Sequence, residues 1–172
     1  AGNTSVCELS GLRIDTAADP TVNTGLFEMI TGTAAKIAVV DSTLKSSGGS
    51  QGAIAGVLDG GTIYQCYSRN NVGDGARNVG GIAGRLTGAG AEIYDCYNLE
   101  SQLEAAGADS AAGGIAGDGS SGTIQNCYNA CLDSGFIKAD ELAGGTAGSI
   151  AGKTGGGNLI QCYSDQTLSD SG

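Results

Sequence analysis

One short segment occurs four times in this 172-residue chain, each time with a Cys-Tyr pair. It reads GTIYQCYS at 61–68, AEIYDCYN at 91–98, GTIQNCYN at 122–129 and NLIQCYS at 158–164. A glycine-rich segment precedes each copy, as GAIAG at 52–56, GGIAG at 80–84, GGIAG at 113–117 and GSIAG at 148–152. Because both segments recur together about every 30 residues, the chain is predicted to be built from stacked repeat units.

Spacing inside a unit is nearly constant, whereas spacing between units varies. The last glycine of the first segment precedes the first apolar residue of the second by 7, 9, 7 and 7 positions, but each cysteine precedes the next unit's isoleucine by 16, 19 and 23 positions. The variable stretches therefore carry the insertions, which in stacked repeats collect on one face. The predicted units lie near 52–68, 80–98, 113–129 and 148–164.

Each unit holds apolar segments of about five residues that are separated by glycine and by Ser, Asn or Asp. The chain has 32 glycines and one proline, without a long stretch of helical period. This pattern predicts an all-β fold: a parallel β-solenoid (β-helix) of about four ~30-residue coils with an N-terminal capping segment. The central isoleucines of the glycine-rich segments are expected to be structural and to point inward: Ile54, Ile82, Ile115 and Ile150.

The Cys-Tyr segment admits two geometries. Ile63 and Cys66 are three residues apart, so a straight strand would point them to opposite faces and place the tyrosines inside. A bend at the intervening polar residue, Gln65 in the first unit, would point Ile63 and Cys66 inward and Tyr67 outward. The bent geometry is favoured because every unit has an amide or a carboxylate at this position.

The paired segments, as in GGIAG followed by GTIQNCYN, resemble the GLUG motif, a glycine-rich repeat of bacterial surface proteins. GLUG repeats occur in large adhesin-like proteins and beside the protease domain of some IgA-cleaving metallopeptidases. The resemblance covers about residues 52–164 and departs from the family where Ile replaces its usual Leu or Val, and at Ser149 in the fourth unit. It implies an extracellular, repeat-built surface module and brings no catalytic residue to this chain.

Four of the six cysteines occupy one repeat position and are predicted to form a structural column of buried free thiols: Cys66, Cys96, Cys127 and Cys162. The other two, Cys7 and Cys131, are a candidate disulfide if the N-terminal segment folds back along the stack. The chain has no histidine and no C-x-x-C pair, so neither a zinc site nor a cysteine nucleophile with its base is expected. No metal and no cofactor is predicted.

The net charge of −10 excludes the basic footprint that nucleic acid requires, and no apolar run is long enough to span a membrane.

Asp-Gly pairs in VGDGARN and AGDGSSG fall short of a calcium loop and indicate turns. Tyr64, Tyr94 and the four Cys-Tyr tyrosines could form an aromatic strip; such strips bind sugars or cover the edge of a core, and the latter is favoured.

Residues 1–50 lack the repeat and are predicted to be an N-terminal cap or assembly segment, followed by solenoid repeats over 51–172. The chain is expected to be a non-enzymatic surface module for adhesion or scaffold, located outside the cell or at its surface. Its partners would be a protein or glycan on a host or neighbouring cell, or copies of itself. One alternative is a self-assembling structural subunit of a surface filament, and a second is a carbohydrate-active enzyme on a β-helix.

Overall fold

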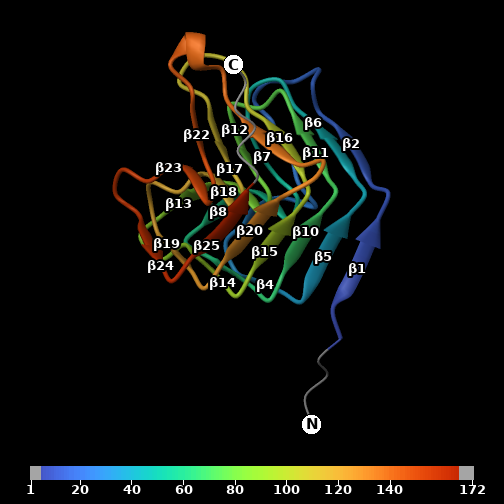
Figure 1. Ribbon diagram of the computed structural model, residues 1–172, viewed down its shortest axis with the longest axis vertical. Helices are drawn as coiled ribbons and strands as arrows, with labels where there is room; N and C mark the ends of the chain where they lie inside the picture. Colours follow the sequence, from blue (N-terminus) through green and yellow to red (C-terminus); the bar gives the residue numbers. More distant parts are fainter. Residues whose placement is uncertain (1–4, 167–172) are drawn as a thin grey trace.

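The computed structural model describes residues 5–166, in which 25 short strands and one 3-10 turn, η1 (Glu141–Ala143), wind into a solenoid (Figure 1). The chain passes through five sheets, here named A to E, in a constant order from which only the first turn departs, because it has no strand in sheet C; every pairing of these strands is parallel. The predicted parallel β-solenoid of about four ~30-residue coils is therefore confirmed.

The sheets contain the following strands. Sheet A contains β1 (Cys7–Ser10), β5 (Ile37–Val40), β10 (Tyr67–Arg69), β15 (Tyr97–Leu99), β20 (Tyr128–Cys131) and β25 (Tyr163–Gln166). Sheet B contains β2 (Arg13–Asp15), β6 (Thr43–Lys45), β11 (Val72–Asp74), β16 (Gln102–Glu104) and β21 (Phe136–Lys138). Sheet C contains β7 (Ser50–Gly52), β12 (Asn78–Gly80), β17 (Ala111–Gly113) and β22 (Thr146–Gly148). Sheet D contains β3 (Phe27–Ile30), β8 (Ala55–Asp59), β13 (Ala83–Thr87), β18 (Ala116–Asp118) and β23 (Ala151–Lys153). Sheet E contains β4 (Thr33–Ala35), β9 (Thr62–Tyr64), β14 (Glu92–Tyr94), β19 (Thr123–Gln125) and β24 (Asn158–Ile160).

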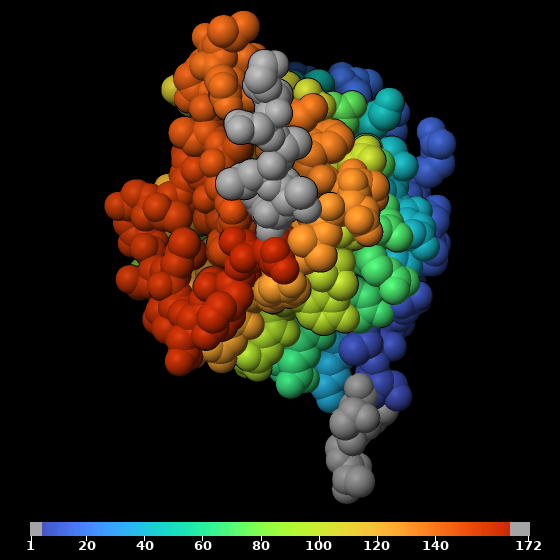
Figure 2. All heavy atoms as spheres, viewed as in Figure 1, coloured from blue at the N-terminus to red at the C-terminus, as the bar shows by residue number. Residues whose placement is uncertain are grey.

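The N-terminal segment enters the same ladders as the repeats. Strands β1 to β4 form the first turn, in which a single bridge from Thr24 to Gln51 replaces a strand of sheet C, and β5 to β7 begin the next turn. In Figure 2 the strands of sheet A lie as adjacent bands from blue at the first turn to red at the last. Residues 5–50 are thus continuous with the stack, and β1 to β4 form its first edge.

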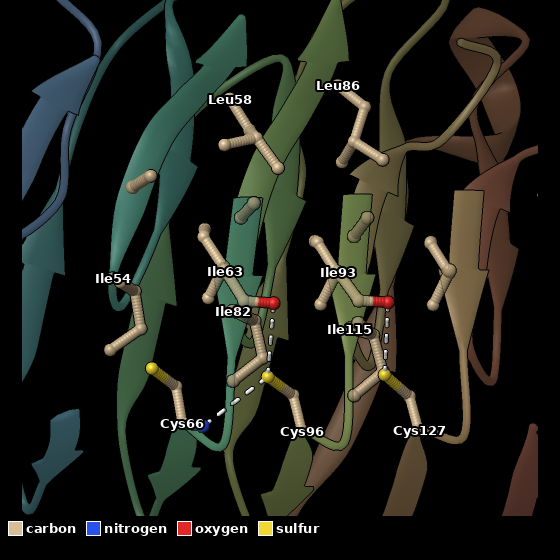
Figure 3. Close-up of a cluster of buried hydrophobic side chains, with 14 of the residues drawn as sticks. Ile54, Leu58, Ile63, Cys66, Ile82, Leu86, Ile93, Cys96, Ile115 and Cys127 are labelled. Carbon is tan, nitrogen blue, oxygen red and sulfur yellow. Dashed lines mark hydrogen bonds between the residues drawn. The ribbon is translucent and has the colours of Figure 1, made fainter. Parts of the chain in front are cut away.

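The core consists of columns in which each coil contributes an equivalent side chain (Figure 3). Ile63, Ile93 and Ile124 pair in register in sheet E and are at most 1% exposed. A parallel column from the glycine-rich segments is 0% exposed at Ile54, Ile82 and Ile115, and Ile150 in the last turn is 9% exposed. Each side chain of a column is buried by the coils on both sides of it. The free energy of unfolding therefore increases with the number of stacked turns.

The bend predicted between sheets E and A is present. The residue before each column cysteine has a left-handed backbone, with φ values of 50° to 53° at Gln65, Asp95, Asn126 and Gln161. One residue in this conformation reverses the alternation of side chains, so Ile63 and Cys66 are both 0% exposed, whereas Tyr67 points outward. Asparagine and aspartate tolerate this region better than most side chains, which accounts for Asp95 and Asn126, whereas Gln65 and Gln161 share only the polar character.

The glycines of the G-x-I-A-G segment allow sheets C and D to approach with their backbones in contact. A Cβ at Gly80 would lie 1.9 Å from the carbonyl oxygen of Ala83, and one at Gly117 would lie 2.6 Å from the backbone nitrogen of Val79. No other residue fits at such distances, because real side chains would displace the facing strand. The close contact separates the main core from a smaller cluster between sheets B and C: Ala76, Val79, Leu103, Ala105 and Ala112.

An insertion in the last turn replaces the usual corner between sheets A and B. In earlier turns this corner is one left-handed residue, Asp41, Asn70 or Glu100. In the last turn the loop 132–135 instead wraps over the Glu100 carboxylate, which accepts hydrogen bonds of 2.7 to 3.1 Å from the four backbone N–H groups of the loop. Desolvation raises the pKa of Glu100, but these four donors outweigh it and lower the pKa to about 2.

No helix among residues 5–166 is long and apolar enough to cross a membrane.

Candidate ligand-binding face

The column cysteines are packed among backbone carbonyl groups. Each Sγ donates to the carbonyl oxygen two residues earlier, as in Cys96 to Tyr94 at 3.3 Å and Cys127 to Gln125 at 3.2 Å. Each also lies within 3.4 to 3.9 Å of a carbonyl oxygen in the preceding coil, such as that of Ile63 for Cys96 (Figure 3). Hydrogen bonds between neighbouring sulfurs shift the pKa values in both directions: those with Cys127 and Cys66 raise the pKa of Cys96, whereas the one with Cys96 lowers the pKa of Cys66, and those with Cys162 and Cys96 lower the pKa of Cys127 to about 4. Cys66, Cys96 and Cys127 are at most 1% exposed, so their sulfurs serve as packing groups.

The structure does not bring Cys7 and Cys131 together. They lie on β1 and β20 of sheet A, with three strands between them, which corresponds to about 19 Å. Cys7 pairs with Ile37, so it stands in the register of the cysteine column, at the exposed end of the stack. Burial, and next the charge of Glu100, raise the pKa of Cys131. All six cysteines are free thiols in this structure.

Two stacks of tyrosine rings flank the corner between sheets E and A. Tyr64 and Tyr94 stack on the sheet E side with ring centroids 5.1 Å apart and planes within 8°. Tyr67 and Tyr97 stack on the sheet A side at 4.8 Å and 4°. Parallel in-register pairing imposes this geometry, because it places equivalent side chains one strand spacing apart. The tyrosines therefore form an outer aromatic strip and not part of the buried core.

An open groove of about 420 Å³ lies beside the Tyr67–Tyr97 stack. Its other walls are the corner residues Lys36, Gln65 and Asp95, with Val6 from the first turn. Lys36 has a left-handed backbone with φ 57°. It is the corner residue of its turn, as Gln65 and Asp95 are in the next two turns. The groove, defined by these six residues, is called the tyrosine groove below.

Tyr67 is anchored at the side of the groove nearest the first turn. Its hydroxyl donates a hydrogen bond of 2.5 Å to the Glu8 carboxylate on β1. This bond, with burial and the negative charge of Glu8, raises the pKa of Tyr67 to about 12. The ring consequently stays neutral and fixed in orientation over the physiological range, which is a property of a pre-formed binding surface.

A second groove, of about 420 Å³, lies around η1 and contains three carboxylates, those of Glu104, Asp140 and Glu141. Asp140 Oδ1 accepts the backbone N–H of Ala143 and caps the 3-10 turn, so this carboxylate has a structural role. Among residues 5–166, no group of three or more Cys, Asp or Glu side chains is arranged to hold a metal ion.

Sequence reasoning considered the aromatic strip but missed the rest of the tyrosine groove. Lys36 and Val6 come from the segment without the repeat motif, where Ile37 and Ala38 stand in place of Cys and Tyr. A signal was nevertheless available, because Gly32-Thr33 precedes Lys36 at the same distance as Gly61-Thr62 precedes Gln65. That match identifies Lys36 as a corner residue.

Parallel ladders, inward columns and a repeated left-handed corner define the chain as a β-solenoid repeat protein. A solved structure with a similar fold is that of a protein from Bacteroides ovatus, described as a putative immunoglobulin A1 protease. It is 22% identical with a TM-score of 0.63, and the match covers 91% of this chain and 57% of that chain. This likeness shows the fold alone. No protein-family model and no curated protein matches the chain, so the resemblance to GLUG repeats remains a prediction.

Proposed function

We propose that this chain is a non-enzymatic surface module that acts outside the cell in adhesion or as a scaffold, built from GLUG-like repeats. The observation that carries this proposal is the tyrosine groove, in which aromatic rings and three polar corner side chains lie together on the outside of a rigid stack. A solenoid of this kind holds outward side chains at fixed spacing, as a recognition surface requires.

Two further observations support this role. The chemistry-bearing residues of the repeat, its column cysteines, are free thiols, and Cys66, Cys96 and Cys127 are buried in the core. The protein of similar fold is described as a putative immunoglobulin A1 protease, and this chain spans 57% of its length. A protein of that description acts on an extracellular substrate, which agrees with a role outside the cell.

Binding of the purified chain to surfaces tests the proposal. Fluorescent beads coated with the chain should adhere to epithelial cells, to immobilised matrix proteins or to bacterial cells, above beads coated with a non-binding protein of similar charge. Incubation with polysaccharides and with immunoglobulin A should release no products. Absence of retention on every surface would reject the adhesive role, and turnover of either substrate would reject the non-enzymatic one.

A filament subunit is the second candidate, and one observation favours it. Leu159 occupies the inward column of Ile63, Ile93 and Ile124, yet it is 45% exposed, since no further coil covers it among residues 5–166. Ile160 and Tyr163 beside it are 42% and 68% exposed. A second copy that adds its first turn to these strands would continue the ladders and cover this surface. Light scattering and electron microscopy at rising concentration test this, and monomers throughout would reject it.

A further inference from the structure

The tyrosine groove begins where two outward columns change from alanine to tyrosine. In sheet E, Ala35 is followed by Tyr64 in the next coil, and in sheet A, Ala38 is followed by Tyr67. Tyr97 stacks on one side of Tyr67, and the other side has no aromatic partner among the described residues. Ala38 is fully buried, so the apolar ring area of the groove is the outer part of Tyr67 and Tyr97, of which Tyr97 is 37% exposed.

The polar side of the groove is a row of three different hydrogen-bonding groups, one from each coil. Lys36 provides an ammonium donor, Gln65 an amide that donates and accepts, and Asp95 a carboxylate acceptor. Their backbones are fixed by ladder bonds of 3.2 to 3.3 Å to the following coil, so the row keeps the spacing of the strands. A ligand with many groups that both donate and accept would satisfy all three.

The charges of the groove select against anionic ligands. Lys36 and Asp95 contribute one charge of each sign, and Glu8 adds a negative charge next to Tyr67. The chain as a whole carries −10, which also repels anions such as acidic glycans. The groove lies on the side of the stack and not at a strand edge, so an extended peptide cannot add a strand there.

From these observations we infer that the tyrosine groove binds an uncharged oligosaccharide. The apolar faces of the sugar rings would pack against Tyr67 and Tyr97, and its hydroxyl groups would bond Lys36, Gln65 and Asp95. The inference rests on the proposed function, because it names the ligand class of that same surface.

Titration of the ¹⁵N-labelled chain with soluble probes, followed by amide chemical shifts, tests the inference. The probes are cellohexaose, mannohexaose and chitohexaose, with a proline-rich decapeptide as the competing ligand class. At least one hexasaccharide should shift the amides of residues 36, 65, 95 and 97. Tyr97→Ala should weaken that binding about tenfold, since one aromatic contact of this kind is lost.

Tyr94→Ala is the matched control, because Tyr94 is also a stacked tyrosine of the same coil and flanks the same Asp95, but does not line the groove. It should leave hexasaccharide affinity unchanged, and thermal melts of both variants check folding. Lys36→Asn and Asp95→Asn retain a residue that accepts the left-handed corner, and each should weaken binding. Equal affinities of Tyr97→Ala and Tyr94→Ala, binding of the peptide alone, or no binding by any probe would each overturn the inference.

Adhesion of coated beads separates this inference from the proposed function. Beads that adhere although no hexasaccharide binds would reject the ligand class and leave the surface role in place. Hexasaccharide binding that depends on Tyr97, with beads that adhere to no surface, would support the groove and reject the adhesive role.

Discussion

Truncation of one core column at two positions tests whether stability arises from burial between neighbouring coils. Ile93 and Leu159 share a column and differ only in their place in the stack. Ile93 is covered by a coil on each side and is 0% exposed, whereas Leu159 belongs to the last turn and is 45% exposed. The two alanine variants are therefore matched in chemistry and in position within the coil.

The expected losses follow from these exposures. Ile93→Ala removes three fully buried carbon groups, which is about 2.4 kcal/mol of transfer free energy, and the closed cavity it leaves brings the total to about 3–4 kcal/mol. Leu159→Ala removes the same number of groups from a half-exposed side chain, and the space it leaves is open to solvent. Its cost should be about 1 kcal/mol, so the two variants should differ by about 2–3 kcal/mol.

Urea unfolding followed by far-ultraviolet circular dichroism measures both values, with equal denaturant slopes required before the free energies are compared. A loss below about 1 kcal/mol for Ile93→Ala would refute the inward column. Equal losses in the two variants would show that the last turn is covered in solution. Concentration dependence of the Leu159→Ala effect would then identify a second copy as the cover.

Three further predictions concern the corners, the loop 132–135 and the thiols. Asn126→Val should destabilise the chain by about 1–2 kcal/mol because a β-branched residue is strained at φ 50°, whereas Asn126→Gly should stay within about 1 kcal/mol in the same urea assay. Since the pKa of Glu100 is lowered to about 2 in the folded chain, its stabilisation is complete above the ordinary pKa of about 4.5 and disappears as the pH falls towards 2. The free energy of unfolding of Glu100→Gln should therefore lie below that of the wild type by about 1 kcal/mol near pH 6, and the two values should converge near pH 2. A difference that stays constant with pH would contradict this explanation. Thiol titration should find six free thiols in the unfolded, unreduced chain and one rapidly reacting thiol, Cys7, in the native chain; four thiols would indicate a bridge.

The sequence predicted the solenoid because inward columns require the same residue in every coil. Ile63 and Cys66 repeat for this reason, and the polar residue between them repeats because the corner needs a left-handed backbone. The spacing of three residues between Ile63 and Cys66 left a straight and a bent strand open, because strand alternation places them on opposite faces unless the chain bends. The amide or carboxylate before each cysteine favoured the bend.

Sheets B and C were not predictable in the same way. Their strands, such as Val72–Asp74 and Asn78–Gly80, carry no shared motif, since their side chains are small and much of their contact is between backbones. The turns formed by residues 5–50 were missed for a related reason. Ile37 is an apolar residue in the cysteine position, so the Cys-Tyr pair that marks the other units is absent there, and only Gly32-Thr33 carries the repeat pattern.

The same reasoning indicates where specificity can reside in this molecule. Inward positions are constrained by the coils on both sides, so they cannot differ from turn to turn without a cost in packing. Outward corner positions have no such constraint, and they change in every turn, from Lys36 to Gln65 to Asp95. A ligand must be recognised by features that are not the same in all coils, since a uniform surface would offer no preferred position. The tyrosine groove meets this condition, because the change of corner residues coincides there with the step from alanine to tyrosine.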